Sequence, residues 1–106
     1  MESAEAVKAL SALAQPTRLA LYRLLVSCGP EGMTAGQIAV TLGVSPATMS
    51  FHFRTLLHAA LVESRQEGRF VYYAANFAVM NGMVAYLTEN CCGGNADACK
   101  TPTTHC

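Results

Sequence analysis

The stretch 34–62, TAGQIAVTLGVSPATMSFHFRTLLHAALV, constrains the fold most, because it encodes two short helices separated by a tight turn. Thr34 can cap the first helix, and the glutamine three residues later can complete a capping box. Gly43 suits the left-handed position that ends this helix. Ser45 can cap the second helix, and Pro46 fits its first position, where no N–H is required.

The second helix has two unlike faces. Met49, Phe53, Leu56 and Leu57 follow at helical spacing and predict a buried stripe. The opposite face is small or hydrogen-bonding, and no acidic residue occurs between positions 45 and 62. Such a helix can approach a polyanion, as the recognition helix of a helix-turn-helix does in the major groove. A plain helical hairpin with a Ser/Thr-rich exposed face is the alternative at this point.

The flanking segments extend this pair into a larger fold. After residue 61 the periodicity changes from helical to alternating, which predicts two strands joined at Glu67 and Gly68. The fold class is therefore mostly α with a small β-hairpin, a winged helix-turn-helix of order α-α-α-α-β-β-α. The remaining helices are expected over 4–14, 16–28 and 77 to about 90, and the strands over 62–66 and 69–74. Helical spacing predicts an apolar side of Val7, Leu10, Leu13 and Ala14 on the first helix, and of Phe77, Met80, Val84 and Leu87 on the last.

Composition sets the expected class of protein. A chain of 106 residues is one domain, here expected over 1–90 with a cysteine-containing tail over 91–106. Because 52% of so short a chain is apolar and only 13% is charged, we expect a homodimer that hides part of this surface. The net charge is zero, so any affinity for DNA must come from locally placed basic groups. The N-terminus does not resemble a signal peptide and no apolar run reaches membrane-spanning length, so we expect a cytoplasmic protein.

The cysteines gather near the end of the sequence. Cys91, Cys92 and Cys99 form a soft ligand set without imidazole or carboxylate, which suits trivalent arsenic or antimony. Zinc prefers four ligands, and Cys106 could supply the fourth. Cys28 ends an apolar helix and is expected to be a small core residue. The alternative is that the tail cysteines are reduced thiols with no ligand role.

The sequence carries no sign of catalysis. It contains no glycine-rich phosphate loop, HExxH or GxSxG motif. Histidines and carboxylates do not cluster in a pattern typical of general acid–base chemistry. We therefore do not expect an enzyme.

Two blocks of sequence resemble the arsenic-responsive (ArsR/SmtB) family of bacterial metalloregulatory repressors: ALAQPTRLALYRLL, and LGVSPATMSFHFRTLLHAALVESRQEGRFVYY. The resemblance implies a homodimer formed through the first and last helices. It also implies operator DNA binding that requires no cofactor and ends when a thiophilic ion binds. The segment MTAGQIAVTL lacks the cysteine pair of many arsenic-sensing members, and FAVMNGMVAYLTEN lacks the histidine ligands of zinc-sensing members. Neither family site can be transferred, so the tail thiols remain as the candidate inducer site.

A DNA interface follows from the helix face and the hairpin tip. We expect Arg54 to contact phosphate from the recognition helix, and Arg65 and Arg69 to do so from the wing, at a minor groove. The dimer would read an inverted repeat with half-sites about one helical turn apart. The residues expected to face the major groove are Ser45, Ala47, Thr48, Ser50, Phe51 and His52.

Several other functions are possible alternatives to arsenic sensing. The inducer could be another soft ion, such as cadmium, lead or copper, or a methylated arsenic species that needs only two thiolates. The chain could instead be a thiol redox switch or a metal-buffering protein on the same fold. A winged helix can also be a protein–protein module, which the broad apolar stripe of the last helix would permit.

Overall fold

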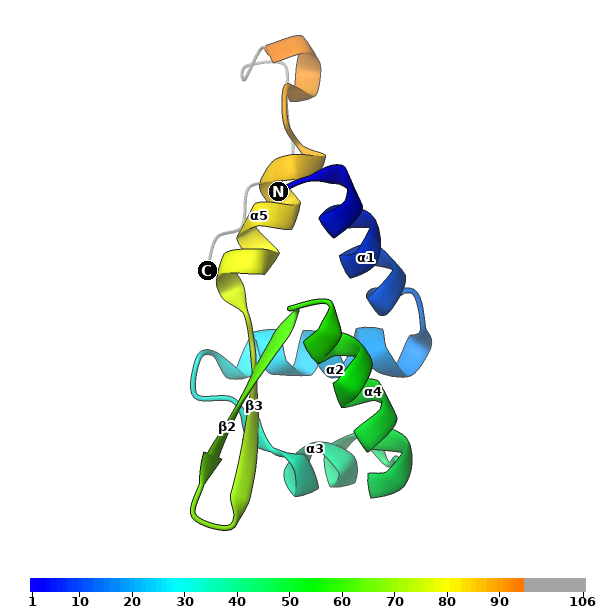
Figure 1. The fold of residues 1–106 in the computed structure, drawn as a ribbon, viewed down its shortest axis with the longest axis vertical. Coiled ribbons are helices and arrows are strands. Elements are labelled where there is room, and N and C mark those ends of the chain that lie inside the picture. Colours follow the sequence, from blue (N-terminus) through cyan, green and yellow to red (C-terminus); the bar gives the residue numbers. More distant parts are fainter. Residues whose placement is uncertain (95–106) are drawn as a thin grey trace.

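The computed structural model describes residues 1–94. The predicted metalloid ligand Cys99 and the possible fourth zinc ligand Cys106 lie outside this part of the chain. Five α-helices, three strands and a short 3₁₀ turn follow one another within it (Figure 1). The order is that of a winged helix-turn-helix, as predicted, with one additional strand, β1. The elements are α1 Ser3–Leu13, α2 Pro16–Cys28, β1 Met33–Thr34, α3 Ala35–Leu42, α4 Pro46–His58, β2 Val62–Glu67, β3 Phe70–Ala75, α5 Phe77–Leu87 and η1 Cys91–Gly94.

The first two helices begin where local chemistry favours it. At α1, the Glu2 N–H donates to the Glu5 carboxylate at 2.8 Å, which completes a capping box. At α2, the Gln15 side chain accepts from the Arg18 N–H at 2.8 Å, and Pro16 occupies the first helical position. The bounds of α2 agree with the predicted range 16–28.

The sheet has the antiparallel order β1-β3-β2. β2 and β3 form the wing, with Val62 opposite Ala75 and Glu67 opposite Phe70. The turn therefore falls on residues 68–69, one position later than predicted. β1 was not predicted, because a two-residue strand carries no periodicity and exists only through its pairing with β3.

The hydrophobic core lies between α2, the helix-turn-helix and the base of the wing. The Phe53 ring of α4 stacks on the Tyr73 ring of β3, with centroids 3.9 Å apart and planes 6° from parallel. This contact fixes the wing against α4. The most deeply buried large side chains are Leu21, Leu25, Ile38, Met49, Leu56 and Leu61.

The helices α1 and α5 lie together at the end of the molecule away from the wing tip (Figure 1). The inward face of α1 consists of small residues, Ala6, Ala9 and Ala12, so its larger Val7 and Leu10 point outward. No helix in residues 1–94 has both the length and the apolar character needed to span a bilayer.

The orientation of α5 differs from the predicted stripe of Phe77, Met80, Val84 and Leu87. Met83 is the residue that α5 buries, whereas Val84 and Leu87 are 53% and 58% exposed. The helix is apolar nearly all round, so its sequence periodicity could not identify the inward side. The consequence is an apolar surface on α1 and α5, defined by Val7, Leu10, Val84 and Leu87.

Candidate nucleic-acid interface and thiol pair

The turn between α3 and α4 is built as its sequence predicted. Thr34 and Gln37 form the capping box of α3, and Gly43 ends that helix in the left-handed region at φ 66°. The Ser45 hydroxyl accepts from the Thr48 N–H at 3.3 Å, which caps α4. These local interactions hold α4 at a fixed angle to α3.

The outer face of α4 is polar near its N-terminus and contains no carboxylate. The exposed residues include hydroxyl groups, one methyl group and an aromatic ring that is 61% exposed, that of Phe51. The hydroxyls of Ser50 and Thr55 donate to backbone carbonyls one turn earlier, at 3.1 and 3.3 Å. The predicted groove-facing residues that the structure places on this exposed face are Ser45, Ala47, Thr48, Ser50 and Phe51.

His52 corrects the prediction, because its side chain is buried and does not point outward with its neighbours. It lies 3.4 Å from the Arg18 guanidinium of α2, measured from His52 Nδ1 to Arg18 Nη1. Arg18 also donates through Nε to the Ala12 carbonyl of α1. Arg18 therefore connects α1, α2 and α4, and His52 is part of this connection.

Burial, and secondarily the charge of Arg18, lowers the pKa of His52 below its ordinary value. The neutral ring then presents Nδ1 as the acceptor for Arg18. The sequence could have predicted the burial of His52, because its spacing from Met49, Phe53 and Leu56 places it on the same buried helix face.

The wing carries its two arginines in different environments. Arg65 stacks over the Tyr72 ring at 4.7 Å and forms an ion pair with Glu67 at 2.9 Å. Both side chains of that pair are exposed, so the pair contributes little to stability. Arg69 lies exposed in the turn at the wing tip. Tyr72 is opposite Arg65 across the hairpin and positions its guanidinium, a contact that was not predicted from the sequence.

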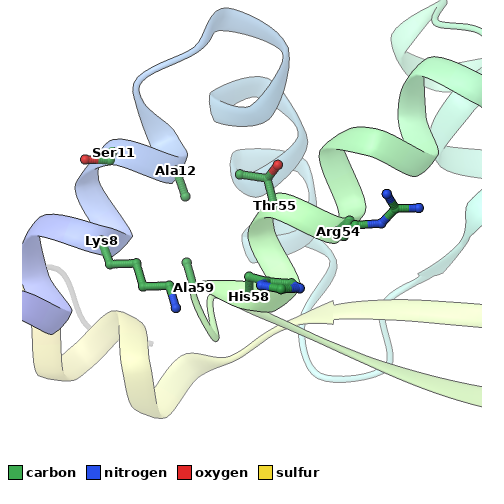
Figure 2. A pocket seen from close by; sticks show the side chains of 7 residues that line it. All are labelled: Lys8, Ser11, Ala12, Arg54, Thr55, His58 and Ala59. Carbon is green, nitrogen blue, oxygen red and sulfur yellow. The ribbon is translucent and has the colours of Figure 1, made fainter.

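Arg54 lies farther along α4, beside a hollow between α4 and α1 (Figure 2). Its side chain is exposed, as a phosphate contact would require. It is more than two helical turns from Ser45, so it belongs to the C-terminal half of α4 and not to its polar N-terminal face.

The thiol pair follows the end of α5. That helix ends at Leu87, three residues earlier than expected, and Cys91 and Cys92 are both exposed in the turn η1. Asn90 and Cys92 have positive φ, so the backbone changes direction around the pair. Among residues 1–94, no three side chains of His, Cys, Asp or Glu are placed to hold a metal ion. Cys28, at the end of α2, is only half-buried and is not among the buried core residues, so the prediction of a core residue was wrong.

Comparison with known proteins agrees with this architecture. A helix-turn-helix domain family matches residues 13–65. The transcriptional repressor SdpR of Bacillus subtilis is 30% identical over 76 residues, which cover 72% of this chain and 81% of SdpR. An ArsR-like transcriptional regulator from Rhodococcus sp. RHA1 superimposes with a TM-score of 0.73 at 29% identity, over 90% of this chain and 85% of that one. Reduced HlyU from Vibrio cholerae superimposes with a TM-score of 0.64 at 30% identity, over 85% and 92%.

These relatives are transcriptional regulators and not enzymes, in agreement with the sequence analysis. The residues that match the family, 13–65, contain α2, β1, the helix-turn-helix and most of β2. The chain belongs to the ArsR/SmtB family of winged helix-turn-helix transcriptional regulators.

Proposed function

We propose that the protein is a cytoplasmic, homodimeric repressor that leaves its operator when trivalent arsenic or antimony binds Cys91, Cys92 and Cys99. The observation that carries the DNA-binding part is the exposed, carboxylate-free N-terminal face of α4, held by a capped turn beside a wing that bears two arginines. DNA binding by this arrangement requires no cofactor. The inducer part rests on the chemistry of the thiol cluster.

On DNA, the N-terminal half of α4 enters the major groove, where the Ser and Thr hydroxyls and the Phe51 ring meet base edges. A phenyl ring suits the methyl group of thymine. Arg65 and Arg69 contact phosphates from the wing, and Arg54 does so from the far end of α4. Because Tyr72 orders Arg65, less side-chain entropy is lost when that contact forms.

The wing assignment has a direct test. Replacing Arg65 and Arg69 by Ala should flatten the dependence of log affinity on log salt concentration by about 0.9 for each phosphate that the wing no longer neutralises. Arg23→Ala, on the exposed side of α2, is the matched control and should leave the slope unchanged. An unchanged slope in the double variant would show that the wing does not touch the DNA backbone.

Dimerisation is supported by the apolar surface on α1 and α5. Its four residues are 42–58% exposed, and they lie on helices that pack against each other. An isologous interface buries such a self-complementary surface twice, once on each subunit. The two recognition helices would then be related by a two-fold axis, which fits an inverted-repeat operator.

Cys91 and Cys92 follow α5, one of the two helices that carry this apolar surface. Soft thiolates bind trivalent arsenic and antimony, and three sulfurs fit the trigonal pyramid of an ion with a lone pair. Since α5 ends at Leu87, Cys91 and Cys92 are not forced apart by helical geometry, and both sulfurs can turn toward one ion. Binding should release protons from the thiols and reorganise the end of α5. A coupling of about 1–3 kcal/mol would weaken operator affinity roughly five- to 150-fold.

Single Cys→Ser variants test the site. Arsenite should release operator DNA from the wild-type protein, and should release it poorly, or not at all, from C91S, C92S and C99S. C28S is the matched control, because Cys28 is half-buried at the end of α2, is not one of the three proposed ligands, and should behave as wild type. Undiminished release from all three tail variants would reject the site.

A thiol redox switch is the second candidate, favoured by the exposure of the adjacent Cys91 and Cys92 and by the relative described as reduced HlyU. Oxidation with diamide would then release DNA as arsenite does, and dithiothreitol would restore binding. Release by arsenite under reducing conditions, without an effect of diamide, would support metalloid sensing. Comparing inorganic with methylated arsenic and with cadmium would identify the inducer class.

A further inference from the structure

A hollow of about 560 Å³ lies between α1 and the C-terminal half of α4 (Figure 2). Its volume is in the range of sites that bind small molecules. The hollow therefore separates α1, which carries part of the apolar surface, from α4, which carries the candidate DNA-binding face. The side chains around it are Lys8, Ser11, Ala12, Arg54, Thr55, His58 and Ala59.

The hollow is lined by both apolar and basic residues. Ala12 of α1 and Ala59 after α4 contribute methyl groups, and Thr55 adds another. Figure 2 shows Lys8 reaching from α1 toward Ala59, with His58 beside them. The aliphatic stem of a lysine can cover an apolar ligand while its ammonium group meets a charge.

No carboxylate lies among the lining residues. The α4 segment has no acidic residue between positions 45 and 62, and Glu5 on α1 accepts the Glu2 N–H in the capping box. The whole chain has no net charge, so this concentration of basic groups is local. Its electrostatic complement is an anion, and its methyl-lined wall is the complement of an apolar body.

We propose that this hollow binds a small organic anion with an apolar body, of the aromatic carboxylate class. The carboxylate pairs with Lys8 and His58, and the ring lies against Ala12, Thr55 and Ala59. Such a ligand bridges α1 and α4, so this is a second ligand site, separate in space and chemistry from the thiol pair.

The test is titration of the full-length reduced protein with 2-naphthoate, followed by amide chemical shifts in two-dimensional NMR. Saturable shifts should concentrate at Ser11, Thr55 and Ala59. The neutral isostere 2-naphthamide should bind at least tenfold more weakly, because it lacks the negative charge that pairs with the Lys8 ammonium group. Equal binding of both compounds, or shifts spread over the surface, would overturn the proposal.

Charge-removing variants sharpen the result. Lys8→Gln should weaken 2-naphthoate binding at least fivefold, and the Lys8→Gln/His58→Gln double variant should weaken it further. The control Arg23→Gln removes a charge from α2, away from the hollow, and its affinity should stay within twofold of wild type. Lys8 and His58 are exposed, so these variants should fold, and circular dichroism melting checks this. If Lys8→Gln lowers the melting temperature while 2-naphthoate does not bind the wild type, the Lys8 charge only stabilises the C-terminus of α4 and the proposal is wrong. Arsenite release of DNA from the double variant is measured separately, so failure here is distinguishable from failure of the proposed repressor function.

Discussion

Replacing Gly32 by alanine should detach β1 from the wing at a large cost in stability. Gly32 has φ 74°, a region that costs an L-residue about 1–2 kcal/mol. An added Cβ would overlap the Tyr73 carbonyl oxygen and lie 2.8 Å from its carbon, and this obstacle is backbone that cannot rotate away. Relieving the overlap separates Met33 from Tyr73, and each broken hydrogen bond adds about 0.5–1.5 kcal/mol. The free energy of unfolding should therefore fall by about 3 kcal/mol or more.

The assay is urea denaturation at fixed protein concentration, with two matched controls. Gly43→Ala meets a comparable positive φ with no atom within 4 Å of the new Cβ, so it should cost only about 1 kcal/mol. Gly36→Ala, inside α3 with open space around it, should be neutral or stabilising by up to about 1 kcal/mol. If Gly32→Ala were no more destabilising than Gly43→Ala, the close approach of residue 32 to β3 would be wrong.

The other predictions concern a helix end, a buried histidine and the apolar surface. Ala60 adopts φ 60° after α4, so Ala60→Gly should raise the unfolding free energy by about 0.5–1 kcal/mol in the same denaturation assay; a decrease would contradict this backbone conformation. The pKa of His52 is lowered in the folded state, so the unfolded chain binds more protons below about pH 6.5, and the free energy of unfolding should fall as the pH drops from that value. His52→Gln should therefore show a weaker pH dependence of the unfolding free energy between about pH 6.5 and 5. The same pH dependence in the variant and the wild type would refute the role of His52. Val84→Asp should convert the dimer to monomer in sedimentation equilibrium, whereas Val40→Asp, at an 83% exposed site on α3, should not; a dimer that persists in Val84→Asp would place the interface elsewhere.

Local signals made the helix-turn-helix predictable from sequence. The caps at Thr34 and Ser45, the proline at position 46 and the left-handed Gly43 each act over a few residues, so their effect can be read without the rest of the chain. The wing was predicted for the same reason, since alternation and a glycine turn are local features.

Features that depend on tertiary packing were missed. The burial of His52 arises from its contact with Arg18, 34 residues earlier in the sequence. The inward side of α1 was predicted wrongly, because three alanines pack more closely against the core than larger residues would and leave Val7 and Leu10 outside. The hollow between α1 and α4 forms from two helices that are distant in sequence, so no local motif predicts it.

In the proposed mechanism, an ion with a lone pair binds the tail thiols and lowers the affinity of the dimer for operator DNA. The most direct measurement is fluorescence anisotropy of labelled operator DNA, titrated with reduced wild-type protein in the presence and absence of saturating arsenite. We predict a dissociation constant raised roughly five- to 150-fold by arsenite, with one arsenic bound per protomer. Identical titration curves under the two conditions would contradict this mechanism.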